Sequence, residues 1–319
     1  MNNVIVAGAG TFGTAVAERL SWNISNRVTL HTIEKDVEKD INEYHMNRKY
    51  FPTRFLSHYL RATSDSSVFG EADVIMLVIP SKAIVAFSEE IRKNTAREPL
   101  IINLAKGMSD DGAFITEKIP FERTASMKGP SFAIETINGF PTSFTFGGKR
   151  GDYEYFRSQV LPDTGFSLDY SSDIRAVELM SILKNMYAIA IGIVSGKFNS
   201  PNVDFLVYTK AVNEMRGLLK IFSCSDDTIF RYCGIGDLGL TALNDLSRNR
   251  TLGMLIGKGF SYDKEGKSAT VVEGLRTVKL IGEITREKDV SEEFPLVQAL
   301  YRLLYEDDTL NNYTLAVLG

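Results

Sequence analysis

Cysteine and histidine are scarce in this chain of 319 residues, which has two cysteines, Cys224 and Cys233, and three histidines. A disulfide framework or a structural zinc site needs more of these residues at closer spacing, so we expect neither and predict no metal site. The two cysteines are expected to be inert core thiols. The histidines occur without a serine or cysteine nucleophile pattern, so we assign them no role.

Long blocks of like charge are also absent, and the net charge is only -4. Clustered basic residues are typical of proteins that bind nucleic acid or anionic membrane surfaces, so neither partner is expected. The first residues lack the pattern of a signal peptide. The apolar run at residues 186–194 is too short to span a bilayer. We therefore expect a cytoplasmic protein without a membrane span.

The first half of the chain alternates short apolar strands with helices, which is typical of a parallel α/β domain. Strands are expected at residues 3–7, 28–33, 74–79, 100–104, 124–127 and 142–146, and helices at 14–21 and 83–93. After about residue 170 helical patterns take over, at 174–195, 203–222, 252–256, 270–286 and 295–305. The sequence predicts an α/β domain over residues 1–170 and an all-α domain over 171–319, with a ligand site between them.

A glycine-rich turn, GAGTFG at residues 8–13, follows the first predicted strand and fits the pattern G-x-G-x-x-G. In this pattern Gly8 permits a tight turn, Gly10 lets a pyrophosphate approach the backbone, and Gly13 lets helix and strand pack closely. The phosphates bind at the N-terminus of the helix that follows. The turn therefore predicts a Rossmann-type dinucleotide-binding domain.

The choice of dinucleotide is expected to depend on Glu34, at the end of the second predicted strand. An acidic residue at this place binds the ribose 2′-hydroxyl of NAD and repels the 2′-phosphate of NADP. NAD is therefore favoured, and NADP stays open because Lys35 and Arg48 are near in sequence.

Lys184 is the only formal charge between Glu178 and Lys197, in a stretch that is apolar on nearly every helical face. Such a helix is normally buried, and an ammonium buried without a partner is strongly unfavourable. Desolvation lowers the pKa of a lysine and makes it usable as a proton donor and acceptor near neutral pH. The alternative is a lysine that reaches solvent from a partly exposed helix.

Two motifs follow predicted strands in the first domain. NLAKGM places Lys106 and Gly107 just beyond a strand end, where open α/β sheets bind ligands. KGPSFA places Gly129 and Ser131, whose backbone and hydroxyl groups suit a phosphate, after the next strand. A surface lysine and a plain Gly-Pro turn are the alternatives.

A third motif, GIGDLGLTALNDLSRNR, lies in the second half of the chain. Asp237 stands among glycines and apolar residues, and Ser247, Arg248 and Asn249 follow. Arginine binds phosphate with two parallel hydrogen bonds, and a helix N-terminus adds amide donors. A solvated helix face is the alternative for the SRNR segment.

In this order the motifs resemble those of the NAD(P)-dependent glycerol-3-phosphate dehydrogenase family, over nearly the whole chain. The resemblance is carried by GAGTFGTAVA, INEYHMNRKYFP, VIPS, NLAKGM, KGPSFA, ELMSILKNMYAIAIGIVSG, GIGDLGLT, SRNR, VVEGLRTVK and FPLVQALYRLLYED. It implies a Rossmann-type domain followed by an all-α substrate domain. It also implies an oxidoreductase, commonly a homodimer, that uses NAD or NADP on a small phosphorylated substrate, dihydroxyacetone phosphate or sn-glycerol 3-phosphate.

The resemblance also implies roles for single residues. Lys184 would be the general acid and base, Lys106 would touch both cofactor and substrate and help to lower the pKa of Lys184, and Asp237 would orient Lys184 or a substrate hydroxyl. Substrate contacts are implied for Lys106, Gly129, Ser131, Lys184, Asp237, Ser247, Arg248 and Asn249. Cofactor contacts are expected for Gly8, Gly10, Thr11, Phe12, Gly13, Glu34, Lys106, Ala133, Arg248, Val271 and Glu273.

The sequence departs from the family pattern after the Lys184 helix. Asp204 stands where Lys or Arg is usual, Phe205 and Leu206 replace small residues, and Lys210 begins a pair that replaces Arg-Gly. These changes leave another polyol phosphate or sugar phosphate open as the substrate. A non-catalytic sensor of the nicotinamide cofactor is a further alternative, although a sensor has no need of a buried lysine.

Overall fold

The computed structural model describes residues 1–108, 112–260 and 272–319. The chain divides into two compact units, Met1–Glu178 (unit 1) and Leu179–Gly319 (unit 2). The division falls inside the long helix α6 (Ile174–Phe198). The domain bounds of 1–170 and 171–319 therefore stay a prediction.

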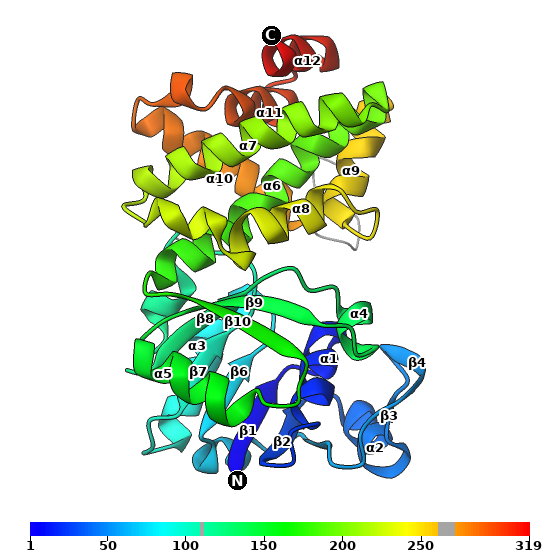
Figure 1. The fold of residues 1–319 in the computed structure, drawn as a ribbon, viewed down its shortest axis with the longest axis vertical. Coiled ribbons are helices and arrows are strands. Elements are labelled where there is room, and N and C mark those ends of the chain that lie inside the picture. Colours follow the sequence, from blue (N-terminus) through cyan, green and yellow to red (C-terminus); the bar gives the residue numbers. More distant parts are fainter. Residues whose placement is uncertain (109–111, 261–271) are drawn as a thin grey trace. The chain divides into compact units, whose positions relative to one another are not determined.

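Unit 1 is built around a sheet whose described strands have the order β10-β9-β8-β7-β6-β1-β2-β5 (Figure 1). These strands are β1 (Asn2–Ala7), β2 (Asn26–His31), β5 (Arg61–Thr63), β6 (Val74–Leu77), β7 (Leu100–Asn103), β8 (Thr124–Lys128), β9 (Thr142–Gly147) and β10 (Phe166–Ser171). Neighbouring strands are parallel except for the antiparallel pair β8 and β9. A separate antiparallel pair consists of β3 (Met46–Asn47) and β4 (Phe51–Phe55). The predicted α/β fold is confirmed, with this antiparallel pair as an addition.

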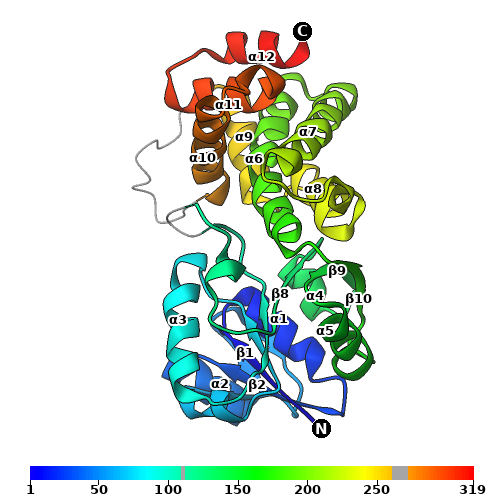
Figure 2. The ribbon, with the colours of Figure 1, turned by 90° about the vertical axis from the view of Figure 1, so that its left-hand side faces the viewer.

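Helices cover both faces of this sheet (Figure 2). The helices of unit 1 are α1 (Thr11–Leu20), α2 (Lys35–Tyr44), α3 (Ser81–Asn94), α4 (Ala133–Ile137) and α5 (Arg150–Tyr155). Val4 of β1 belongs to the apolar core that includes Leu20 of α1, whereas Ile5 belongs to the core that includes Ile84 of α3. Successive strand residues point to opposite faces, so the strands are buried on both sides, as parallel sheets usually are.

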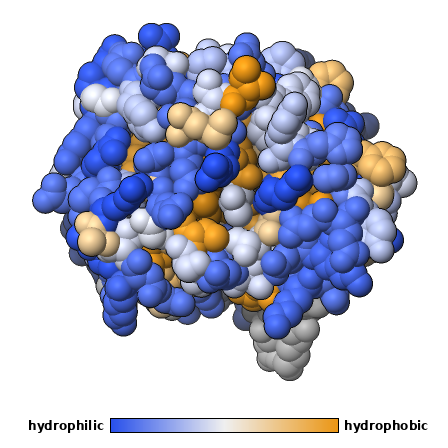
Figure 3. Space-filling view, turned by 90° about the horizontal axis from the view of Figure 1, so that it is seen from below, coloured by the Kyte–Doolittle hydropathy of each residue, from blue (hydrophilic) through white to orange (hydrophobic). Residues whose placement is uncertain are grey.

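The surface seen in Figure 3 is mostly hydrophilic, and the hydrophobic residues on it form small, separate patches. Scattered apolar residues of this kind are normal on a surface in contact with water.

Among its described residues unit 2 has helices and loops but no strand, and α6 lies in the middle of its helices (Figure 1). The other helices are α7 (Pro201–Ile221), α8 (Asp237–Ala242), α9 (Arg248–Gly257), α10 (Glu273–Glu287), α11 (Pro295–Tyr305) and α12 (Leu310–Leu318). Among the described helices, α6 alone has the length and hydropathy of a membrane span, but all residues of its most apolar segment are buried. That burial is what a core helix requires.

Glycines bring the backbones of α6 and α9 into direct contact. Four glycines line this contact, namely Gly192 and Gly196 on α6 and Gly253 and Gly257 on α9. A Cβ atom added at Gly253 would lie 2.2 Å from the carbonyl oxygen of Ile189, and the other three positions meet backbone of the opposite helix at similar distances. Any side chain at these positions would force the two helices apart.

A buried carboxylate holds α11 against α6 and α7. Glu214 on α7 accepts hydrogen bonds from the backbone N–H groups of Leu296 (2.6 Å) and Val297 (3.1 Å) at the start of α11. The hydroxyl of Tyr187, one turn beyond Lys184 on α6, donates to the same carboxylate at 3.1 Å. Burial raises the pKa of Glu214 to about 7, although these hydrogen bonds oppose the shift.

We predict that Gly253→Ala destabilises the protein by roughly 1–3 kcal/mol, the usual cost of overpacking a tight contact. Gly151→Ala is the matched control, because a Cβ atom at this helical glycine of α5 meets nothing within 4 Å. The control should be neutral or slightly stabilising. Urea unfolding followed by circular dichroism compares the two, and equal stability of Gly253→Ala and the wild type would contradict the close contact.

The raised pKa of Glu214 predicts a pH dependence of stability. Since its pKa in the folded state, about 7, lies above the unfolded value of about 4.3, the folded protein holds a proton that the unfolded chain releases. The free energy of unfolding should fall as the pH rises from 4.5 to 7, by up to about 3 kcal/mol.

Urea titrations of the wild type and of Glu214→Gln across this pH range measure the effect. Glu214→Gln should lack this decline, while Glu287→Gln, a change at an exposed glutamate of the same unit, should follow the wild type. If the free energy of unfolding changed with pH in the same way in all three proteins, Glu214 would be ionised over this whole pH range.

Candidate functional site

The glycine turn of unit 1 has the geometry that its sequence pattern predicts. Gly8 has φ +113°, a backbone conformation that other residues rarely adopt, and a Cβ atom there would lie 2.5 Å from the carbonyl oxygen of Val78. At Gly13 a Cβ atom would lie 1.8 Å from the carbonyl oxygen of Gly8, so helix α1 and strand β1 can pack only without it. At Gly10, in contrast, no described atom lies within 4 Å of the Cβ position.

The open position at Gly10 marks where a ligand can approach the backbone. Gly10 caps α1 in an extended conformation, and no side chain of the described residues caps the first turn. Thr11 is exposed and Phe12 is half-buried in this turn. The N-terminus of α1 therefore presents free N–H groups and the positive end of its helix dipole, which suit a pyrophosphate.

Glu34 stands at the N-terminus of α2 and is held in place by two neighbours. It forms an ion pair with Lys49, and the hydroxyl of Tyr50 donates to it at 3.1 Å. The hydrogen bond from Lys49 lowers the pKa of Glu34, so the carboxyl group is ionised at neutral pH. Arg48, one of the two basic residues expected near Glu34, pairs with Asp40 instead, and Lys49 is the residue that forms the ion pair with Glu34.

The loops after β7 and β8 carry the remaining predicted residues of unit 1. Lys106 is half-buried, and the following Gly107 has φ +130°. Gly129 leaves no room for a side chain, because a Cβ atom would lie 2.2 Å from the carbonyl oxygen of Ser143. The Ser131 hydroxyl donates to the carbonyl oxygen of Gly129 at 3.0 Å, and the half-buried Ala133 begins α4. Both loops lie at carboxyl ends of parallel strands, the usual ligand-binding edge of such a sheet.

In unit 2 the structure brings Lys184 and Asp237 together. Both side chains are at most 2% exposed, and they form an ion pair between α6 and the first residue of α8. The hydroxyl of Thr241 lies 3.5 Å from the Oδ1 atom of Asp237. The buried Oδ2 atom of Asp237 has no hydrogen-bond partner among the described residues. A buried oxygen without a partner is costly, so this atom is available to accept a hydrogen bond from a ligand.

A chain of amide hydrogen bonds surrounds Asn185, the residue after Lys184. Its Nδ2 group donates to Glu273 at 3.2 Å, and its Oδ1 atom accepts from the side chain of Asn249 at 3.1 Å. Asn249 in turn accepts from the backbone N–H of Gly274 at 3.1 Å. These hydrogen bonds fix the side chain of Asn249 relative to α6. Through Asn185 they also connect Asn249 with Glu273, although the sequence predicted these two site residues from separate motifs.

The start of α9 holds the other predicted residues of unit 2. The Ser247 hydroxyl caps this helix by accepting from the backbone N–H of Arg250 at 3.3 Å. Arg248 is exposed, and its side chain forms no hydrogen bond or ion pair with the described residues. Its guanidinium group is therefore free to bind an anion.

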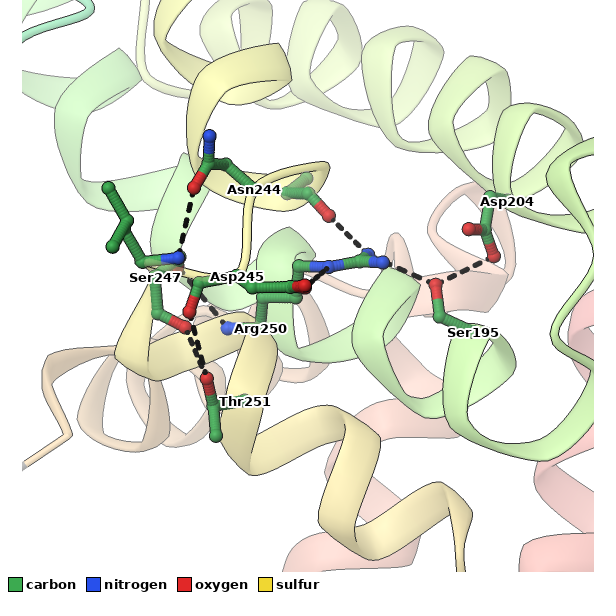
Figure 4. A network of polar contacts seen from close by, with 9 residues as sticks. Ser195, Asp204, Asn244, Asp245, Ser247, Arg250 and Thr251 are labelled. Carbon is green, nitrogen blue, oxygen red and sulfur yellow. Dashed lines mark hydrogen bonds and ion pairs between the residues drawn. The ribbon is translucent and has the colours of Figure 1, made fainter.

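Arg250 connects this helix start to α6, α7 and α8 (Figure 4). Its guanidinium group donates to the carbonyl oxygen of Ala242 at 2.6 Å and to the Ser195 hydroxyl at 3.0 Å. The Ser195 hydroxyl donates to Asp204 at 2.7 Å. Asp204, one of the departures from the family pattern, is therefore part of the network that holds α9.

The predicted residues thus form two sets, one in each unit. The glycine turn, Glu34, Lys106, Gly129, Ser131 and Ala133 belong to unit 1, and Lys184, Asp237, Ser247, Arg248, Asn249 and Glu273 belong to unit 2. Val271 lies outside the described residues. Sequence reasoning missed the link made by Asn185, although a second polar residue beside Lys184 in an apolar helix was a usable signal.

Comparison with family models matches both units. The model "NAD-dependent glycerol-3-phosphate dehydrogenase N-terminus" matches residues 3–153, and the model of the C-terminus of the same family matches residues 173–314. Together they cover most of the chain.

Individual proteins of the same family are similar to this chain over nearly its whole length. A glycerol-3-phosphate dehydrogenase [NAD(P)+] from Methanothermobacter thermautotrophicus is 31% identical over 97% of this chain and 95% of its own length. A protein of the same name from Staphylococcus saprophyticus is 29% identical over 100% and 98%. The crystal structure of glycerol-3-phosphate dehydrogenase from Coxiella burnetii has a TM-score of 0.85 and 26% identity, and covers 99% of this chain and 98% of its own.

Proposed function

Because this chain belongs to the NAD-dependent glycerol-3-phosphate dehydrogenase family, we propose that it interconverts dihydroxyacetone phosphate and sn-glycerol 3-phosphate. The buried ion pair of Lys184 and Asp237 is the observation that carries this proposal. A charge pair buried on the long apolar helix α6 is expensive, and the Oδ2 atom of Asp237 has no hydrogen-bond partner among the described residues, so it could accept a hydrogen bond from a ligand.

The cofactor site that we propose is the glycine turn with the N-terminus of α1. The space at Gly10 and the uncapped first turn fit a dinucleotide pyrophosphate. When bound, the nicotinamide cofactor supplies or accepts the hydride. The ionised Glu34 would accept a hydrogen bond from a ribose 2′-hydroxyl, which favours NAD over NADP.

In the direction of reduction, the proposed role of Lys184 is to give a proton to the carbonyl oxygen. As the carbonyl carbon gains a hydride, its oxygen gains the electron pair of the C=O bond and takes a proton from the Lys184 ammonium. The Asp237 carboxylate balances the charge of Lys184 in this buried site and orients it. In the reverse direction neutral Lys184 removes the hydroxyl proton, and Asp237 then stabilises the ammonium that forms.

We propose that the phosphate of the substrate is bound at the start of α9. The free guanidinium group of Arg248 and the oriented amide of Asn249 would bind phosphate oxygens. Lys106, Gly129 and Ser131 are the groups that we assign to the substrate in unit 1, with Lys106 also touching the cofactor. Holding the phosphate in this way would turn remote binding energy into correct placement of the carbonyl group.

Two finer points complete the proposal. We place the enzyme in the cytoplasm, and we propose that it works as a homodimer. Phe205 and Leu206 on α7, which are 56% and 41% exposed, would supply apolar surface for an interface within unit 2. Sedimentation equilibrium measures the mass in solution directly.

We predict that Lys184→Met lowers kcat by about 10²–10⁴-fold, the usual contribution of a positioned general acid. The loss of NADH absorbance with dihydroxyacetone phosphate measures turnover. NADH binding, followed by fluorescence, shows that the variant is folded. Lys197→Met, a change at a half-buried lysine in the last turn of the same helix, is the matched control and should keep turnover within about twofold. Turnover of Lys184→Met within a few-fold of the wild type would rule out the proton-transfer role.

We also predict that the wild type prefers NADH and that Glu34→Gln raises the NADPH/NADH ratio of kcat/KM at least tenfold. The substitution removes the charge that repels a 2′-phosphate and frees Lys49 to pair with it. Asp36→Asn, a change at an exposed carboxylate of the same helix, is the control and should leave the ratio unchanged. A wild type that prefers NADPH would contradict the assignment of Glu34.

A further inference from the structure

A second lysine of unit 1, Lys128, is as deeply buried as a core residue, yet nothing in the proposed reaction uses it. Its side chain, at the end of β8, is 3% exposed. The ammonium group donates to the carbonyl oxygen of Asn103 at 2.8 Å and to that of Ala105 at 2.7 Å. Both carbonyl groups belong to the end of β7 and the loop that leads directly to Lys106.

The side chain of Asn103 is held in turn by the buried carboxylate of Glu178. This carboxylate is 1% exposed, and it accepts from the side chain of Asn103 and from the hydroxyl of Thr116 at 3.0 Å. The Asn103 side chain also accepts from the backbone N–H of Ala105 at 2.9 Å. Burial raises the pKa of Glu178 while the charge of Lys128 opposes the shift, so the two groups are close enough to interact.

These contacts link the two strand-end loops of unit 1. Lys128 directly precedes Gly129, so one residue anchors the loop of Gly129 and Ser131 through its backbone and the loop of Lys106 through its side chain. Loops beyond strand ends are usually mobile, and hydrogen bonds from an ammonium group are roughly twice as strong as neutral ones. The backbone before Lys106 is thereby restrained at two carbonyl groups, those of Asn103 and Ala105.

We propose that Lys128 is a positioning residue that sets the place of Lys106 by fixing the backbone at residues 103–105. The inference rests on the proposed function, because it assigns to Lys106 a contact with the substrate. A misplacement of a contacting group by about 1 Å can cost 10²-fold in rate. The substrate class on which Lys128 acts, through Lys106, is the phosphorylated ketone.

The test is a double-mutant cycle of Lys106→Met and Lys128→Met. We measure kcat and KM for dihydroxyacetone phosphate, the Kd of NADH, and the Tm of each variant. Lys128→Met alone should lower kcat/KM by about 10–100-fold, and it should change the Kd of NADH by no more than Lys106→Met does, because Lys106 is also assigned a contact with the cofactor. In the Lys106→Met background the same substitution should have less than about a threefold effect, because Lys128 would act only through Lys106.

A purely structural role predicts a different result. Lys128→Met would then lower the Tm and would reduce kcat/KM by the same factor in both backgrounds, and this outcome would overturn the inference. An unchanged kcat/KM in Lys128→Met would also overturn it. If Lys106→Met itself keeps full activity, the proposed role of Lys106 fails instead, so the two failures are distinguishable.

Two further variants keep the test valid if Lys128→Met is unstable. Lys128→Met/Glu178→Gln removes both buried charges together, which avoids leaving an unpaired carboxylate, and should show the same loss of kcat/KM. Lys149→Met, a change at an exposed lysine of the same unit, is the control for loss of one positive charge and should behave as the wild type.

Discussion

The ion pair between Lys184 and Asp237 is the interaction on which the organisation of unit 2 depends. It lies in the helix whose faces are otherwise apolar, so the surrounding helices must both exclude water from α6 and deliver one carboxylate to it. Asp237 supplies this carboxylate from the first residue of α8. The neighbouring Asn185 extends the polar strip and connects it to α9 and α10. A small polar centre is therefore built into the apolar core of unit 2.

In unit 1 the groups available to a ligand are mainly backbone groups rather than a single buried side chain. Its glycine turn and the loops after β7 and β8 expose N–H and C=O groups at the carboxyl ends of parallel strands. The shape of the turn and loops is set by positions that tolerate no Cβ atom, such as Gly13 and Gly129, and by the buried charges of Lys128 and Glu178.

Local patterns in the sequence predicted the parts whose physical cause is local. The strand β1, the glycine turn and the bounds of α11 follow from short-range periodicity and composition. The local pattern left two alternatives for Lys184, a buried or a solvent-reaching side chain, and the structure shows it buried. The strand β10 was missed because its sequence, FSLDYS, mixes polar and apolar residues at the edge of the sheet. The helix α2 was missed because only two of its residues are buried.

The partners of Glu34 and Asn185 could not be predicted, since Lys49 is 15 residues and Asn249 is 64 residues away along the chain. Only the folded backbone brings such groups together.

The glycine contact between α6 and α9 has a consequence for how this scaffold can diversify. Two helices joined backbone to backbone cannot slide or tilt independently, so the spacing between the residues they carry is fixed by main-chain geometry. A new phosphorylated substrate of another length would have to be accommodated by exchanging side chains at the ends of these helices. A library that varies the residues around Arg248 and leaves the four glycines untouched would search the region where such change is physically available.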